Sequence, residues 1–106
     1  MKVNNVEIEW LDKEWIESLL WCPSQIWRRA RVGNKVYTLY LRWRWEDPWT
    51  FSIIEEDPAG SKTLEWDLFA EKGLFFCDYE YKEAEKMAEK LFIEWVKESL
   101  AKSKQK

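Results

Sequence analysis

The chain has 106 residues, of which 46% are hydrophobic and 17% aromatic, so it is long enough for one domain with its own core and too apolar to be disordered. Its net charge of −3 excludes a protein whose overall charge attracts nucleic acid. No run of roughly eighteen apolar residues is present, and no secretion signal is seen, so we expect a soluble, cytoplasmic protein without a membrane-spanning helix. Histidine is absent, and Asn and Gln are scarce beside many Glu and Lys residues, a balance typical of heat-adapted proteins.

The first quarter of the sequence predicts a short strand followed by a helix. Apolar and acidic residues alternate over residues 6–10, as in a half-buried strand. Asp12 has the residue type of a helix N-cap, and an apolar stripe at helical spacing follows it. The stripe consists of Trp15, Ile16, Leu19 and Leu20. We therefore expect an N-terminal helix from about Lys13 to Trp21.

From Ile26 onward the pattern changes to a period of two, which predicts a β-hairpin. Gly33 and Asn34 connect the two strands, and glycine at the first turn position favours a type II′ turn. The predicted register pairs Val32 with Lys35, Ala30 with Tyr37, and Trp27 with Tyr40. One face of the hairpin is then apolar, apart from Arg28 near its edge, and the other is basic and aromatic. This second face consists of Trp27, Arg29, Arg31, Val36, Thr38, Tyr40, Arg42 and Arg44.

Further strands are expected at residues 49–56 and 63–70, and the apolar run 74–77 would add one more. The short link between the hairpin and the next strand sets Trp49 opposite Trp45. Seven of the nine tryptophans fall on inward faces in this arrangement, namely Trp10, Trp15, Trp43, Trp45, Trp49, Trp66 and Trp95. The tryptophans are therefore expected to serve mainly as core residues.

The C-terminal quarter predicts an amphipathic helix. Its apolar residues recur at helical spacing, and they are Ala84, Met87, Ala88, Leu91, Phe92, Trp95, Val96 and Leu100. Residues 102–106 are expected to form a frayed basic tail after a single domain that spans residues 1–101. Together the elements predict an α+β fold, in which an antiparallel four- to five-stranded meander sheet has an N-terminal and a C-terminal helix packed on one face.

The residue types available for catalysis are few. Without histidine the chain has no imidazole base, and Cys22 and Cys77 alone cannot build a tetrahedral zinc site. The two cysteines are expected to be small buried side chains, with a disulfide between them as the alternative. The acidic clusters lie at predicted turns, and no phosphate-binding or nucleophile motif is present. We therefore expect no enzyme activity, no cofactor and no metal.

The arginines are the most unusual feature of the sequence. All five lie between Arg28 and Arg44, no acidic residue lies within residues 26–45, and residues 46–80 are strongly acidic. In the expected register three arginines share a row with a carboxylate two strands away: Arg29 with Glu56, Arg42 with Glu65, and Arg44 with Asp67. Exposed ion pairs contribute only about 0–1 kcal/mol each, but they cancel much of the local positive potential. One interpretation of the basic face is thus a lattice of ion pairs within the sheet.

Two binding functions are the alternatives to a purely structural lattice. Arginines interleaved with aromatic rings on a sheet face can bind RNA or single-stranded DNA. Alternatively, the predicted row of Trp27, Tyr40 and Ile54 can form a contact with a protein partner or in a homodimer. The candidate binding face for both functions consists of Trp27, Arg29, Arg31, Tyr40, Arg42, Arg44 and Ile54. We expect a non-enzymatic interaction module that binds a protein partner or itself, with nucleic-acid binding as the alternative.

Overall fold

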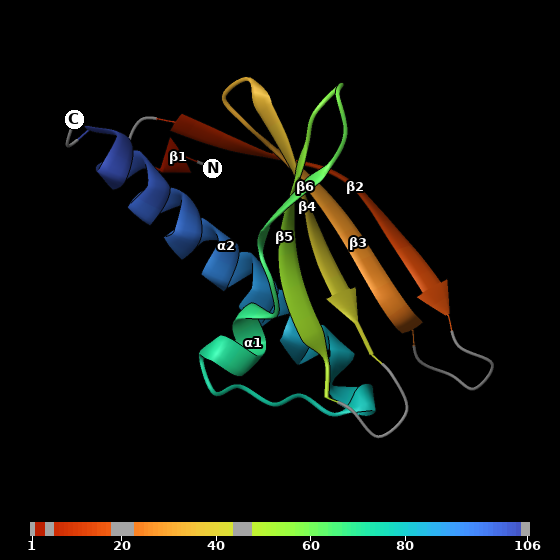
Figure 1. Cartoon of the computed structure of the whole chain (residues 1–106). Helices are drawn as coiled ribbons and strands as arrows, with labels where there is room; N and C mark the ends of the chain where they lie inside the picture. Colours follow the sequence, from red (N-terminus) through yellow and green to blue (C-terminus); the bar gives the residue numbers. More distant parts are fainter. Residues whose placement is uncertain (1, 4–5, 18–22, 44–47, 105–106) are drawn as a thin grey trace.

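The computed structural model describes residues 2–3, 6–17, 23–43 and 48–104 of the chain, and these form an α+β fold (Figure 1). Its elements, in chain order, are β1 (Lys2–Val3), β2 (Val6–Glu17), β3 (Pro23–Val32), β4 (Lys35–Arg42), β5 (Thr50–Glu56), β6 (Lys62–Glu65), α1 (Leu68–Glu71), the short 3₁₀ helix η1 (Asp78–Glu80) and α2 (Tyr81–Lys104). Among the described residues the strands form one six-stranded sheet in sequence order, and each strand is antiparallel to its neighbours. The predicted antiparallel meander is therefore confirmed.

The hairpin of β3 and β4 has the predicted register. Val32 pairs with Lys35, Ala30 with Tyr37, and Trp27 with Tyr40. Gly33 has a φ of 64°, whereas Asn34 is not in the left-handed region, and this combination is the one that a type II′ turn requires. Glycine adopts the positive φ without a steric penalty, so the turn sets the register of the two central strands.

The predicted N-terminal helix is wrong where the structure describes it, because residues 13–17 belong to strand β2. The rest of the predicted helix lies outside the described residues. A β-bulge explains the misleading pattern: β2 has one residue more than β3 between the pairs Trp10–Ala30 and Lys13–Arg28. A bulge changes the phase of the alternation in the middle of a strand. The apolar residues before and after the bulge therefore follow two different phases of the period of two. Taken together, their spacing resembles the apolar stripe of a helix.

Strand β5 pairs with β4 in a register shifted by two residues from the expected one. Arg42 pairs with Thr50, and Tyr40 pairs with Ser52, whereas the sequence predicted Ser52 opposite Arg42. The expected partner of Trp49, Trp45, lies outside the described residues. A shift of two residues keeps every side chain on its predicted face, so the shift changes the rows of the sheet but not its two surfaces.

The segment that follows β6 departs most from the expected structure. The predicted strand 63–70 ends at Glu65, and Trp66, expected in the core, has 76% of its surface exposed. Asp67 adopts a left-handed conformation, with φ 48°, and its carboxylate accepts a hydrogen bond from the amide of Ala70 as the N-cap of α1. Residues 74–77 form no strand, so the prediction of one more strand there is wrong.

Helix α2 crosses the sheet and covers one face, which we call the inner face (Figure 1). Phe92 is fully buried at the centre of this contact and packs its ring against Trp10, Tyr37 and Trp95. The single turn of α1 adds Phe69, which packs against Phe51 of β5. The predicted C-terminal helix is confirmed, and it continues through Lys104. The opposite face of strands β3, β4 and β5 is called the outer face below.

Candidate outer-face site

The structure places six of the seven predicted site residues on the outer face. Trp27, Arg29 and Arg31 alternate with the buried residues Ile26 and Ala30 along β3. The same alternation holds for Tyr40 and Arg42 on β4 and for Ile54 on β5. Arg44 lies outside the described residues. The predicted face therefore exists as one surface.

The predicted ion pair between Arg29 and Glu56 is confirmed, although the two residues do not lie in one row of the sheet. Two nitrogens of the guanidinium, Nε and Nη2, donate to the two carboxylate oxygens at 3.1 and 2.8 Å. Thr38 is only 3% exposed, and its hydroxyl also donates a hydrogen bond to Glu56 at 2.9 Å. The hydrogen bond from Arg29 lowers the pKa of Glu56, and the pKa of Arg29 is raised by the same bond. Because Thr38 pairs with Ile54 rather than with Glu56, Arg29 reaches this carboxylate along a diagonal.

Strand β2 supplies two further carboxylates that were not expected on this face. Asp12, predicted as a helix cap, accepts a bond from Arg29 at 3.2 Å. Glu9 pairs with Arg31, also at 3.2 Å. Asp12 was predicted to begin a helix, and the short strand predicted over residues 6–10, which includes Glu9, was not paired with the hairpin. Only the pairing of the long strand β2 with β3 therefore reveals these partners. Arg29 and Arg31 are therefore neutralised by carboxylates of the neighbouring strand β2 and, for Arg29, also of β5, two strands away.

Of the other two predicted rows, the one that joins Arg42 to Glu65 does not form in the described part of the chain, and the one that joins Arg44 to Asp67 lies outside it because Arg44 does. Glu65 accepts a hydrogen bond from the indole Nε1 of Trp95 at 3.2 Å, which directs it toward α2 and away from Arg42. Asp67 caps α1 and forms no ion pair with Arg42. The guanidinium of Arg42 has no ion-pair partner among the described residues. Arg42 thus differs from Arg29 and Arg31, each of which pairs with a carboxylate.

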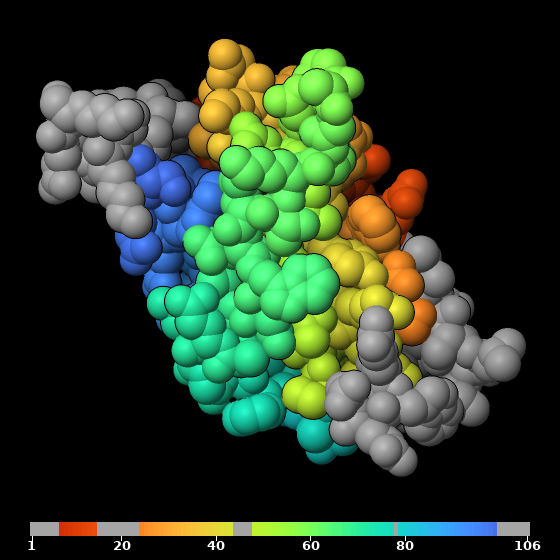
Figure 2. Space-filling model, in the orientation of Figure 1, coloured from red at the N-terminus to blue at the C-terminus, as the bar shows by residue number. Residues whose placement is uncertain are grey.

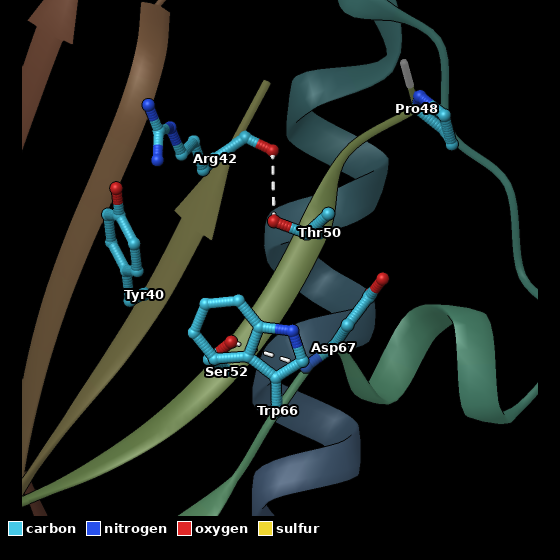
Figure 3. A pocket seen from close by; sticks show the side chains of 7 residues that line it. All are labelled: Tyr40, Arg42, Pro48, Thr50, Ser52, Trp66 and Asp67. Atoms are coloured by element: carbon cyan, nitrogen blue, oxygen red, sulfur yellow. Dashed lines mark hydrogen bonds between the residues drawn. The ribbon is translucent and has the colours of Figure 1, made fainter. Parts of the chain in front are cut away.

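A pocket adjoins Arg42 on the outer face, where strand β4 ends (Figure 3). Its volume is about 310 Å³, and it is lined by Tyr40, Arg42, Pro48, Thr50, Ser52, Trp66 and Asp67. In the space-filling view the green segment that precedes α1 stands beside the yellow surface of β4 and β5, and α2 lies on the other side (Figure 2). The pocket therefore lies between the surface of the sheet and the irregular segment after β6.

Local hydrogen bonds fix the walls of this pocket. The hydroxyl of Thr50 donates to the carbonyl oxygen of Arg42 at 3.3 Å, and the amide of Asp67 donates to Ser52 Oγ at 3.2 Å. On the strand side Tyr40 packs against Trp27, with 4.8 Å between the ring centroids. The Trp27 indole is itself held by a hydrogen bond to Gln25 at 3.1 Å. Backbone pairing and side-chain bonds thus hold the aromatic and polar groups in place.

Five residues of the pocket were not among the predicted site residues, namely Pro48, Thr50, Ser52, Trp66 and Asp67. Trp66 and Asp67 were furthest from their expected positions. Both were assigned to a continuous strand, with Trp66 in the core. The signal that could have placed them is the cap: an Asp followed by Leu68 and Phe69 is a typical helix start, and a helix start ends the preceding strand. Ending the strand at Glu65 removes the alternation that sends Trp66 inward.

The described residues contain no group of three His, Cys, Asp or Glu side chains arranged to hold a metal ion. No helix in the part of the chain that the structure describes is long and apolar enough to cross a membrane. Cys77 is exposed, contrary to the expectation that it is buried, and Cys22 lies outside the described residues. The outer face, with its arginines and aromatic rings, therefore remains the candidate site.

No protein-family model, no curated protein and no solved structure matches the chain significantly. The functional argument therefore depends on the geometry of the outer face.

Proposed function

We propose that the chain is a non-enzymatic interaction module, and that its partner on the outer face is a second copy of the same chain. The observation that carries the proposal is the exposed aromatic surface of this face, where the Trp66 indole is 76% exposed beside the ring pair of Trp27 and Tyr40. Tryptophan, tyrosine and arginine are the residues that dominate binding energy at protein interfaces. Both helices bury their apolar side chains against the inner face, which leaves the outer face for a partner.

The ion pairs of the face favour an identical partner. Two like-charged surfaces repel each other, and the three described arginines of the outer face, Arg29, Arg31 and Arg42, would make it strongly positive if none of them were paired. Here Arg29 and Arg31 are neutralised by Glu56, Asp12 and Glu9 within the same molecule. Because Arg29 and Arg31 are paired internally and Arg42 alone of the described arginines on this face is not, the face can approach its own copy with much less of this repulsion. Such a symmetric contact places the same patch on both subunits.

The same ion pairs weigh against the alternative of RNA or single-stranded DNA binding. Phosphate binding depends on cationic side chains that are available to replace counterions. Arg29 and Arg31 already have carboxylate partners, and binding of a phosphate would have to compete with them. The interaction with protein therefore has the stronger support.

Sedimentation equilibrium tests the proposal. We expect the native chain to show a dimer at concentrations on the order of 100 µM, a range typical of a modest interface. Ile54→Asp introduces an unpaired charge at the centre of the face and is expected to weaken association at least about tenfold. Ser99→Asp introduces the same charge on the exposed side of α2 and is the matched control, expected to leave the dimer unchanged.

A native chain that remains monomeric at all concentrations up to about 1 mM would contradict the proposal. Equal weakening by Ile54→Asp and Ser99→Asp would also contradict it, because association would then not depend on the outer face. Circular dichroism of each variant shows whether the fold is retained before the masses are compared.

A further inference from the structure

We propose that the pocket formed by Tyr40, Arg42, Pro48, Thr50, Ser52, Trp66 and Asp67 binds a small aromatic carboxylate, with the carboxylate on Arg42 and the ring against Trp66. This inference shares Trp66 with the proposed self-association but concerns one end of the outer face and a small ligand, so its test includes a variant, Ile54→Asp, that separates the two. Its basis is the juxtaposition of a cation, aromatic walls and a cavity of suitable size.

The guanidinium of Arg42 provides the anion-binding group. Among the described residues it has no ion-pair partner, whereas Arg28, Arg29 and Arg31 each pair with at least one carboxylate. A guanidinium offers a planar fork of donors that matches the two oxygens of a carboxylate. Figure 3 shows the guanidinium of Arg42 on the same side of the pocket as the Tyr40 ring. An anion bound there would gain a partner that none of the described residues supplies to Arg42.

The opposite wall favours an aromatic group. In Figure 3 the Trp66 indole lies over Ser52, across the pocket from Arg42 and Tyr40. With 76% of Trp66 exposed, a planar ligand can cover much apolar surface there. Aromatic rings pair favourably in offset or tilted arrangements, which adds to the gain from burial. The two walls therefore select a ligand with a ring at one end and an anion at the other.

Asp67 does not prevent this binding, although its carboxylate lines the same pocket. Its side chain accepts a hydrogen bond from Ala70, so the negative charge is engaged at the start of α1. Figure 3 shows the carboxylate on the side of Thr50 and α1, opposite the side that holds the Arg42 guanidinium. A ligand that carried a second negative charge near Asp67 would be repelled. The pocket is thus expected to prefer monocarboxylates.

The size of the pocket limits the ligand. A volume of about 310 Å³ lies at the lower end of the range for small-molecule sites, which is roughly 300 to 1,000 Å³. This space suits one ring and a short acid chain. For a ligand of about ten non-hydrogen atoms we expect a dissociation constant on the order of 1 mM.

The test uses 3-phenylpropionate as the probe and 3-phenylpropionamide as its neutral counterpart. Titration of the full chain is followed by two-dimensional proton–nitrogen NMR, in which the Trp66 indole and the Arg42 side chain give separate signals. We expect the acid to shift both signals and the amide to bind at least about fivefold more weakly, because the amide loses the charge-assisted bonds to Arg42. Propionate, which lacks the ring, is expected to bind more weakly than 3-phenylpropionate.

Two variants and a control locate the site. Arg42→Gln is expected to weaken binding of the acid about tenfold and to remove its preference over the amide. Trp66→Ala is expected to weaken the binding of both the acid and the amide, since it removes the aromatic wall that both ligands contact. Arg31→Gln is the matched control, because Arg31 lies on the same face outside the pocket and already pairs with Glu9. It should leave binding unchanged.

Equal binding of the acid and the amide by the native chain would overturn the proposal, as would equal losses for Arg42→Gln and Arg31→Gln. The absence of any shift at Trp66 or Arg42 would overturn it as well. The same titration with Ile54→Asp separates this site from self-association, because Ile54 does not line the pocket. Binding by that variant supports the pocket whether or not the native chain dimerises.

Discussion

Arg28 and Arg42 belong to neighbouring strands of one sheet, yet they meet opposite environments. Arg28 lies on the inner face, where its guanidinium is 4.7 Å from the centre of the Trp10 ring and pairs with Glu85 and Glu89 of α2 at 3.3 and 2.8 Å. Arg42 lies on the outer face and has no ion pair among the described residues. The role of an arginine in this sheet therefore depends on which face it occupies and on whether a helix brings carboxylates to it.

The aromatic residues show the same contrast. Phe92 is completely buried under the inner face, and it contacts three other rings there. Trp66, at the outer pocket, leaves 76% of its surface in solvent. Burial of an aromatic side chain stabilises the fold, whereas exposure of one leaves its apolar surface for a partner. The inner face thus stabilises the fold, and the outer face carries the exposed aromatic surface that we propose for binding.

The largest expected effect is on the inner face. Phe92→Ala should lower the free energy of unfolding by about 3–5 kcal/mol, because it leaves a cavity among packed rings. Trp66→Ala removes a larger side chain but should change stability by less than about 0.5 kcal/mol, since its indole is mostly exposed. Guanidinium denaturation followed by circular dichroism measures both values. Similar losses for the two variants would abolish the proposed difference between the faces.

The two arginines give an intermediate effect. Arg28→Gln should lower the free energy of unfolding by about 2 kcal/mol, because Glu85 and Glu89 lose a partner in a region where the Arg28 side chain is only 22% exposed. Arg42→Gln should change stability by less than about 0.5 kcal/mol. The denaturation midpoints of the two variants report this difference, provided that the free energy of unfolding depends on denaturant concentration with the same slope in both. A larger loss for Arg42→Gln would show that it has a structural partner.

The smallest effect concerns the paired part of the outer face. The pKa of Glu56 is lowered from its usual 4.5 in the folded state, chiefly by Arg29. Its contribution to stability is therefore complete above the unfolded pKa and is lost as the pH falls through the folded pKa. At pH 7 we expect Glu56→Gln to cost about 1 kcal/mol, reduced by solvent screening of a partly exposed pair. The difference from the native chain should disappear in strong acid.

Glu9→Gln is the control for that measurement. It interrupts the pair of Glu9 with Arg31, in which both side chains are at least half exposed, so the loss at pH 7 should be below about 0.5 kcal/mol. If Glu56→Gln destabilises the protein equally at pH 7 and in strong acid, the effect does not come from its ionised carboxylate. Free energies of unfolding at several pH values distinguish these results.

The central hairpin and the C-terminal helix could be predicted from the sequence because their signals are local. Gly33 accepts the positive φ that a two-residue turn requires, and the turn fixes the register of β3 with β4. In α2 the apolar residues keep their spacing without interruption, and Ala84, Phe92 and Val96 are buried as expected. Regular periodicity and a specific turn are sufficient for such elements.

The start of the sheet could not be predicted in the same way. The bulge in β2 is visible only when β2 is paired with β3, and no single residue in the sequence marks it. The helix prediction hid Asp12 as a partner of Arg29, and Glu9 was predicted in a short strand that was not paired with the hairpin. Of the carboxylates that pair with Arg29 and Arg31, the sequence therefore identified only Glu56. Long-range pairing, rather than local propensity, decides the conformation there.

The candidate site was predicted only in its strand residues. Tyr40 and Arg42 follow from the hairpin register, but Trp66 reaches the pocket because β6 ends before it and Asp67 turns the chain into α1. A left-handed conformation at Asp67 interrupts the alternation that would have buried Trp66. The pocket thus depends on a break in regular structure, which a period of two cannot reveal.

The difference between the two faces is tested most directly by the indole N–H signals of the tryptophans at increasing protein concentration. Each indole reports on its own surroundings, so the outer-face Trp27 can be compared with Trp10 and Trp95, which pack against the core under α2. We expect the Trp27 signal to move with concentration in the native chain and not in Ile54→Asp, while those of Trp10 and Trp95 stay fixed. Movement of the Trp10 or Trp95 signals alone, or no movement at all, would contradict association through the outer face.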